Sequence, residues 1–155
     1  MCEMFYLGSD KPGRPVVDHS RNEGYPEHIH DNLELIYITA GTRKCNIGGR
    51  EYTEPTGSLT VIFPFQPHSF PDSPGAEYYW IGVNPMFMPE LRGLLFEYIP
   101  VIPVINAERL GRSAELAAYL FSSPPDTREI TLNALALALV SGLFDELSLN
   151  KRERM

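Results

Sequence analysis

The sequence lacks the features of a secreted or membrane protein. Its two cysteines, Cys2 and Cys45, lie far apart and form no pairing pattern, which points to a reducing, intracellular setting. The start, MCEMFYLGSDKPGR, has no basic segment followed by an apolar one, as a signal peptide would. The apolar run ITLNALALALVSGLF, residues 130–144, is interrupted by polar residues and falls short of the ~20 apolar residues of a membrane span. We therefore expect a soluble cytoplasmic protein.

Positive charge is also scarce. Thirteen lysines and arginines against 20 acidic residues give a net charge of −7, and no basic face is visible in the first 150 residues. Phosphate contacts dominate nucleic-acid affinity, so this chain by itself is a poor nucleic-acid binder. The one basic cluster is KRERM at Lys151, Arg152 and Arg154, interpreted as cations at the end of a helix or as the start of a linker.

The length of 155 residues fits one domain with a sizeable core. Up to about residue 85 the chain shows short segments rich in β-branched and aromatic residues, bounded by turn residues. These segments are LELIYITAG, RKCNIGGREY, GSLTVIFPF and AEYYWIGVN. Gly48 and Gly49 predict a hairpin turn, because glycine accepts the positive φ angles of a type I′ loop. The pattern predicts a barrel or sandwich.

From Asn106 the hydrophobic period becomes helical. Asn106 is a candidate cap for AERLGRSAELAAYLF, which SSPPD terminates. Asp126 and Glu129 stand at capping-box spacing before a second helix of about 30 Å. Residues 86–105 form a connecting region that could hold a short helix.

The second predicted helix is apolar over more than one face. Its leucine stripe consists of Leu132, Leu135, Leu139, Leu143 and Leu147. Further apolar residues, including Ala134, Leu137 and Phe144, widen the surface beyond the ~100° that packing on one partner needs. We therefore expect the helix to contact both this chain's own barrel and a second copy, with the leucine stripe at a dimer interface. The alternative is a helix buried within one protomer.

Two of the four histidines stand in the segment EHIHDNLELIYITAG. On an unbroken strand His28, His30 and Glu34 would share one face, and the isoleucines that continue that face predict that it is buried. His68, in FPFQPHSF, is a fourth candidate. Three imidazoles and a carboxylate form a credible first shell for Fe, Mn, Ni or Zn. The same side chains could instead be polar groups of an organic-ligand pocket, or solvent-facing residues without function.

These residues resemble a known pattern. HIHDNLELIYITAG is similar to the first cupin motif, H-x-H-x-x-x-E, with Gly41 at its closing glycine. A second motif runs approximately from Gly57 to His68. The departures from the second motif are Phe63 in place of proline, Phe65 in place of glycine and Asp72 in place of asparagine. The resemblance covers about residues 20–85 and implies a mainly β fold, a double-stranded β-helix (jelly-roll) barrel followed by two α-helices.

A cupin barrel followed by a longer leucine-rich helix resembles the amino-terminal domain of AraC-type transcription regulators. The sequence of the segment IGGREYTEPTGSLTVIFPFQPHSF is also similar to the barrels of that family. The resemblance implies a barrel with an amino-terminal arm over residues 1–105 and a two-helix dimerisation appendage over 106–155. It further implies a small effector, often a sugar, and a homodimer formed through the final helix. In such regulators a separate domain with two helix-turn-helix units reads DNA. That domain is absent from these 155 residues, so the chain is expected to be a module of a longer regulator or to work alone.

Three hypotheses for function follow. In the first, which we favour, the protein is not an enzyme but binds an effector through His28, His30, Glu34 and His68. Tyr78 and Trp80 share a parity on their strand, and one of them could stack on a sugar ring or another flat apolar face, although the alternative for Trp80 is an ordinary core residue. The second is a metal-dependent cupin enzyme, such as a dioxygenase or a sugar-phosphate isomerase, with the same three histidines and Glu34 as ligands. The third is a dimerisation scaffold with an empty barrel.

Overall fold

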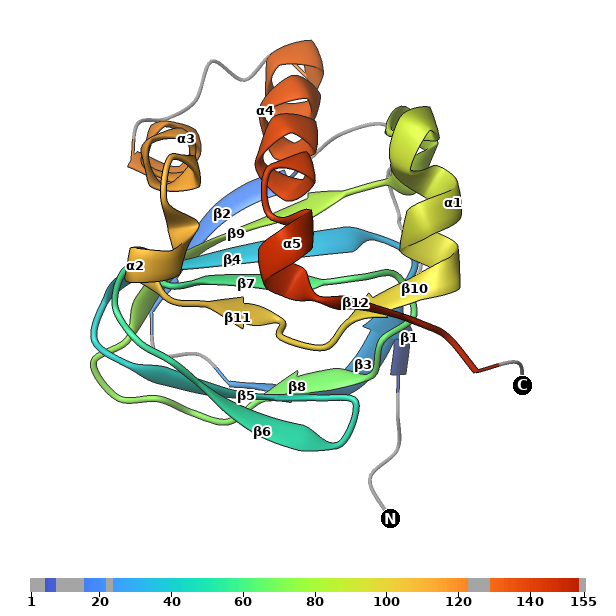
Figure 1. Cartoon of the computed structure of the whole chain (residues 1–155). Helices are drawn as coiled ribbons and strands as arrows, with labels where there is room; N and C mark the ends of the chain where they lie inside the picture. Colours follow the sequence, from blue (N-terminus) through green and yellow to red (C-terminus); the bar gives the residue numbers. More distant parts are fainter. Residues whose placement is uncertain (1–4, 8–15, 22–23, 123–128, 154–155) are drawn as a thin grey trace.

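Two five-stranded sheets form the body of the protein and face each other as a jelly-roll barrel (Figure 1). The computed structural model describes residues 5–7, 16–21, 24–122 and 129–153. One sheet has the order β1-β3-β8-β5-β6, formed by β1 (Phe5–Leu7), β3 (Tyr25–His30), β8 (His68–Phe70), β5 (Arg43–Ile47) and β6 (Arg50–Glu54). The other has the order β11-β7-β4-β9-β2, formed by β11 (Val104–Ile105), β7 (Leu59–Ile62), β4 (Leu33–Ala40), β9 (Glu77–Val83) and β2 (Val16–Arg21). The mainly β cupin barrel is confirmed.

Four predicted strand segments are confirmed as β4, the β5–β6 hairpin, β7 and β9. Gly48 and Gly49 have φ angles of 58° and 81°, as a type I′ turn requires. The amino-terminal β1 pairs in parallel with β3, placing Phe5 beside His28 and Leu7 beside His30 in the register. The predicted arm therefore contributes an edge strand next to the strand that carries both histidines.

Side-chain alternation along the strands creates two separate cores. Between the sheets lie the buried residues Ile36, Ile38, Cys45, Ile47, Ile62, Phe70 and Tyr78. The residues of opposite parity on β4, β7 and β9 face outward, where helices cover the second sheet (Figure 1). These helices are α1 (Pro89–Glu97), preceded by the 3-10 turn η1 (Pro85–Phe87), α3 (Ser113–Ser122) and α4 (Glu129–Ser141). α1 is the short helix expected in the connecting region.

The two predicted helices after residue 106 are each broken. Gly111, with φ of 54°, separates α2 (Ala107–Leu110) from α3, and the side chain of Asn106 makes no capping hydrogen bond. α4 ends at Ser141, and α5 (Phe144–Leu147) follows after Gly142. A Cβ at Gly142 would lie 3.1 Å from Ser113 Oγ, so close packing favours glycine there. α4 thus spans 13 residues, about 20 Å rather than 30 Å. The predicted cap residue Asp126 lies outside the described residues.

The leucine stripe lies largely in the protomer's own core. Leu132, Leu139, Leu143 and Leu147 are between 0% and 4% exposed, and Leu135 is half-buried. The interpretation of these leucines as surface for a second copy is therefore corrected: the outer face of the β11-β7-β4-β9-β2 sheet already covers them. The exposed side of α4 carries other residues, among them Ile130 and Ala134. The division into a barrel and an appendage stays a prediction, and the two parts share one core.

The chain returns to the barrel after α5. β12 (Leu149–Lys151) pairs antiparallel with β10 (Tyr98–Pro100), with Lys151 opposite Tyr98. Lys151 therefore ends a strand and Arg152 follows it, which corrects the expectation of a helix end for these two residues; Arg154 lies outside the described residues. Within the described ranges, no helix is long and apolar enough to span a bilayer.

Candidate functional site

The chain turns between the two histidines and the glutamate. β3 ends at His30, a bend occupies Asp31 and Asn32, and β4 begins at Leu33 in the facing sheet. The prediction of one unbroken strand is therefore wrong. On such a strand His30 and Glu34 would be about 13 Å apart. The bend instead folds Glu34 back across the interior, and its carboxylate reaches the His30 ring.

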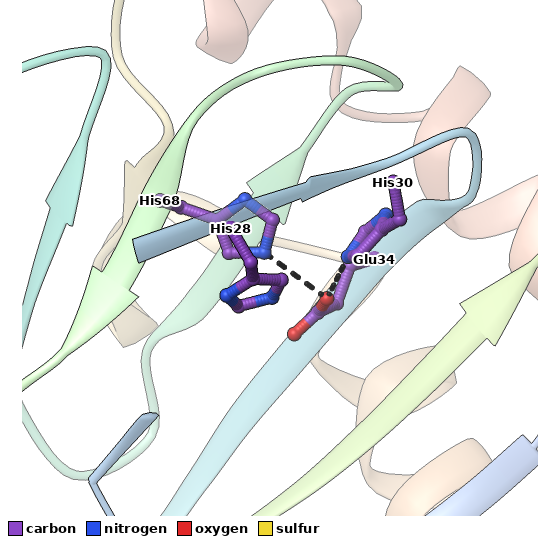
Figure 2. A group of neighbouring side chains, drawn as sticks. All are labelled: His28, His30, Glu34 and His68. Carbon is purple, nitrogen blue, oxygen red and sulfur yellow. Dashed lines mark hydrogen bonds and ion pairs between the residues drawn. The ribbon is translucent and has the colours of Figure 1, made fainter. Parts of the chain in front are cut away.

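The four predicted side chains converge inside the barrel (Figure 2). Nε2 of His30 lies 2.7 Å from Oε2 of Glu34, and Nε2 of His68 lies 3.5 Å from the same oxygen. His28 is the register partner of His68, with ring centroids 4.1 Å apart. The three histidines are between 1% and 8% exposed. One nitrogen or oxygen from each of the four residues can be chosen so that all lie within 4.8 Å of one another.

Backbone carbonyls orient two of the imidazoles. Nδ1 of His28 lies 2.8 Å from the oxygen of Pro26, and Nδ1 of His68 lies 2.7 Å from the oxygen of Gln66. A carbonyl only accepts, so each Nδ1 carries the proton and donates it. The proton-free Nε2 of each ring is left as an acceptor. Nε2 of His68 is buried with no hydrogen-bond partner among the described residues, and such a group calls for a ligand or water.

The residues of the cluster differ in how their surroundings shift their pKa values. Burial opposes the charged form of Glu34, but the hydrogen bond from His30 and the electrostatic influence of the nearby His68 ring outweigh it and hold the pKa of Glu34 well below its usual range. Burial also opposes a charged His30, yet the hydrogen bond to Glu34 raises the pKa of His30 overall. Burial and the neighbouring His68 lower the pKa of His28. The site thus combines a carboxylate, an imidazole that favours its proton and an imidazole that favours the neutral form.

The donor set fits a divalent transition-metal ion. Imidazole and carboxylate suit Fe, Mn, Ni and Zn. The Nδ1–H to carbonyl bonds of His28 and His68 are the outer contacts that fix a metal-binding tautomer. Nε2 of His68 is a ligand atom without a hydrogen-bond partner in the described part of the chain. These residues could equally hydrogen-bond an organic ligand.

Trp80 and Tyr78 both face the interior, but they lie at different places. Gly82 is the cross-strand partner of Glu34, and a Cβ at Gly82 would lie 3.5 Å from the Trp80 ring. The Trp80 indole therefore leans toward the histidine cluster. Tyr78 pairs with Ile38, four residues along β4 from Glu34, about 13 Å away. Its ring packs against the guanidinium of Arg43, 4.2 Å from the centroid.

A buried ion pair at that end was missed by sequence reasoning. Arg43 and Glu54 are 1% and 0% exposed, and Thr60 Oγ1 donates to Glu54. The signal was present, because alternation places Arg43 on the same face as Cys45 and Ile47. The hairpin register also sets Arg43 opposite Glu54, equally far from the glycine turn.

The loop between β7 and β8 was the part of the second motif that departed most from the cupin pattern. Phe65 has φ of 62°, the left-handed region that favours glycine, and it stands where the motif has glycine. Phe63 is fully buried, and its backbone N–H donates to Oε1 of Gln66. Phe65 thus adopts the positive φ angle that a glycine at this position would favour.

Comparisons with known proteins agree with the fold. Residues 14–152 match the family model described as the AraC-like ligand binding domain. A structure of ToxT from Vibrio cholerae matches with a TM-score of 0.55 and 12% identity, over 86% of this chain and 57% of ToxT. Wild-type ToxT of Vibrio cholerae strain SCE256, bound to an unsaturated fatty acid, matches with a TM-score of 0.57 and 12% identity, over 87% and 55%. This chain thus spans little more than half the length of ToxT. No curated protein sequence matches significantly. With most of its length matched by the family model, the chain belongs to the AraC-like ligand binding domain family.

Proposed function

We propose that this domain senses a small effector inside its barrel as part of a transcription regulator, and that it is not an enzyme. The carrying observation is the buried cluster of His28, His30, Glu34 and His68 within an AraC-like ligand binding domain. A pocket with apolar walls and a few converging polar groups is the usual design of a small-molecule site. Such a regulator acts in the cytoplasm, where we place this protein.

The chemistry of the cluster favours a hydroxylated effector such as a sugar. The free Nε2 atoms of His28 and His68 and the carboxylate of Glu34 are all acceptors, which sugar hydroxyls can satisfy. Trp80 supplies a flat apolar wall beside Glu34. The ToxT of strain SCE256 binds an unsaturated fatty acid. In this chain a fatty-acid carboxylate would meet the negative charge of Glu34, so we expect an uncharged ligand.

We further propose that the domain forms a homodimer through the exposed side of its helices. Ile130 on α4 is 77% exposed and Tyr119 on α3 is 64% exposed. Ala134 and Ala138 lie four and eight positions after Ile130, on the same helical face. This face replaces the predicted leucine stripe as the surface for a second copy. DNA would be read by a separate domain of the regulator.

A divalent metal at the cluster is the second candidate, and the orphaned Nε2 of His68 favours it. His28, His30, His68 and Glu34 would hold the ion. A bound ion of this type polarises an oxygen of a ligand. It would serve either as part of the sensed ligand or, in the alternative of a cupin enzyme, at a catalytic centre.

A thermal-shift screen tests the proposal, because a compound that binds only the folded state raises the melting temperature. The panel contains sugars, polyols, small carboxylates, an unsaturated fatty acid, Fe²⁺, Mn²⁺, Ni²⁺ and Zn²⁺. We expect a hydroxylated compound to stabilise the wild type and the surface control Glu51→Gln, and not Glu34→Gln or His68→Gln. A panel without any stabilising compound would favour the empty scaffold.

Elemental analysis of protein purified without a histidine tag separates the two candidates. A metal that is present at near-stoichiometric amounts and is lost in His30→Ala would establish that the cluster binds a metal ion. A metal-free, folded protein that responds to a sugar or polyol would leave the cluster as a hydrogen-bonding site.

A further inference from the structure

Arg152 fastens the end of the described chain to the barrel. Its Nε donates to the oxygen of Tyr98 at 3.2 Å, and Nη2 donates to the oxygens of Leu95, at 3.3 Å, and Pro64. Its backbone N–H donates to the oxygen of Glu97 at 2.7 Å. The side chain is half-buried and forms no ion pair with any described residue. A partly buried cation needs such hydrogen bonds, since its burial is otherwise costly.

The Pro64 carbonyl belongs to the loop of residues 63–68, which also positions the site. The N–H of Phe65 donates to the oxygen of His30 at 2.8 Å. The oxygen of Gln66 accepts the Nδ1 proton of His68 at 2.7 Å. Phe65 and Gln66 of this loop therefore hold the backbone of His30 and the ring of His68. The neighbouring Pro64 carbonyl accepts the hydrogen bond from Arg152.

The same loop carries unfavourable backbone geometry. Phe65 has φ of 62°, a left-handed conformation that is unfavourable for a residue other than glycine. Such a conformation persists only where the surroundings hold it in place. The contacts that hold it include the hydrogen bond to His30, the clamp from Arg152, and the packing of the Phe65 ring on Phe96 of α1, with centroids 5.9 Å apart. Removing the clamp should let the loop relax.

We infer that Arg152 is a positioning residue for the binding site, and that the docking of residues 149–152 and the arrangement of His30 and His68 stabilise each other through the loop of residues 63–68. Coupling between two sites is reciprocal. An effector that orders the histidines therefore favours the docked carboxyl-terminal segment, a step that rests on the proposed function. In a longer regulator, a domain attached after this segment would receive the signal at its point of attachment.

Amide hydrogen exchange on the full chain tests the inference without any ligand. We compare the wild type with Arg152→Gln, with Arg152→Lys, which keeps the charge but loses the fork of donors, and with the control Lys151→Gln. Lys151 is the exposed neighbour on the same strand, so its variant removes the same charge and leaves the clamp. Arg152→Gln should speed exchange of the Phe65 amide about tenfold or more. Arg152→Lys should have an intermediate effect, and Lys151→Gln should have none.

The β5–β6 hairpin provides the internal reference, because its amides lie away from the clamp. Equal acceleration of the Phe65 and hairpin amides in Arg152→Gln would show a general loss of stability and overturn the inference, as would unchanged exchange at Phe65. The reverse direction uses His68→Gln, in which the Arg152 amide, bonded to Glu97, should exchange faster. An unaffected Arg152 amide would contradict the reciprocity. Failure of the proposed function appears separately, as a ligand panel without a stabilising compound.

Discussion

Arg43 and Glu54 face each other across the β5–β6 hairpin inside the barrel. Nε of Arg43 lies 2.6 Å from Oε2 of Glu54, and Nη2 lies 2.9 Å from Oε1. The guanidinium is stacked between the rings of Phe70 and Tyr78, 4.2 Å from each centroid. The Phe70 ring also contacts the His68 ring, with centroids 5.7 Å apart, so this pair lies one ring away from the histidine cluster.

Breaking this pair should destabilise the fold strongly. Glu54→Gln or Arg43→Met leaves one buried charge without its partner, which typically costs about 3–5 kcal/mol. The double variant Arg43→Met with Glu54→Leu should recover part of the loss. Denaturant unfolding measures each free energy. The matched control is the exposed pair Lys44–Glu51, where Lys44→Ala should cost at most about 1 kcal/mol. Similar losses in the two pairs would contradict the account.

Gly41, the closing glycine of the first motif, should tolerate no side chain. Its φ is 70°, and a Cβ would lie 2.4 Å from the backbone oxygen of Gly75. Gly75 has a similar φ of 80° but open space around it. Gly75→Ala should therefore cost only the backbone strain, about 1–2 kcal/mol, and Gly41→Ala clearly more. Melting temperatures of the two variants decide the point, and equal shifts would count against the close contact.

The ion pair between His30 and Glu34 predicts a stability window in pH. The raised pKa of His30 gives stability that is full below its ordinary value of 6.5 and is lost as the pH rises through the folded value. The lowered pKa of Glu34 gives stability that is present above 4.5 and is lost as the pH falls. The difference in unfolding free energy between wild type and Glu34→Gln should peak between these two values. A difference independent of pH would show that the pair is not charged.

The exposed helix face predicts the oligomeric state. Sedimentation equilibrium should give a dimer for the wild type, and Ile130→Asp should shift it to monomer because a carboxylate would enter the apolar contact. Val101→Asp, at a residue 40% exposed elsewhere on the surface, is the control and should stay dimeric. A wild type that remains monomeric at high concentration would remove this interface.

The sequence allowed the barrel to be predicted because its strands alternate clearly and its turns carry glycines such as Gly48 and Gly49. It also identified the four cluster residues, although for a partly incorrect reason. Parity suggested one strand, whereas the bend at Asp31 and Asn32 places Glu34 in the facing sheet. Asp31 and Asn32 are turn-favouring residues, so a local signal for the bend was present, but its consequence for Glu34 depends on how the sheets pack.

The other features that could not be predicted from the sequence are two helix breaks and several contacts between distant segments. The breaks at Gly111 and Gly142 were hidden because apolar spacing continues through both glycines. Whether Trp80 or Tyr78 stands near the cluster depends on the pairing of β9 with β4. The hydrogen bond from Arg152 to Pro64 joins residues that are 88 positions apart. Local sequence patterns do not predict contacts over such a separation.

The most direct test of the central claim is the ¹⁵N spectrum of the histidine rings during titration with a compound that stabilises the protein in the thermal-shift panel. If His28, His30 and His68 bind the effector together with Glu34, their ring resonances should shift together at the concentration that raises the melting temperature. His19, on β2, serves as the reference and should stay unchanged. A compound that stabilises the fold while the three cluster rings keep their resonances would contradict the account.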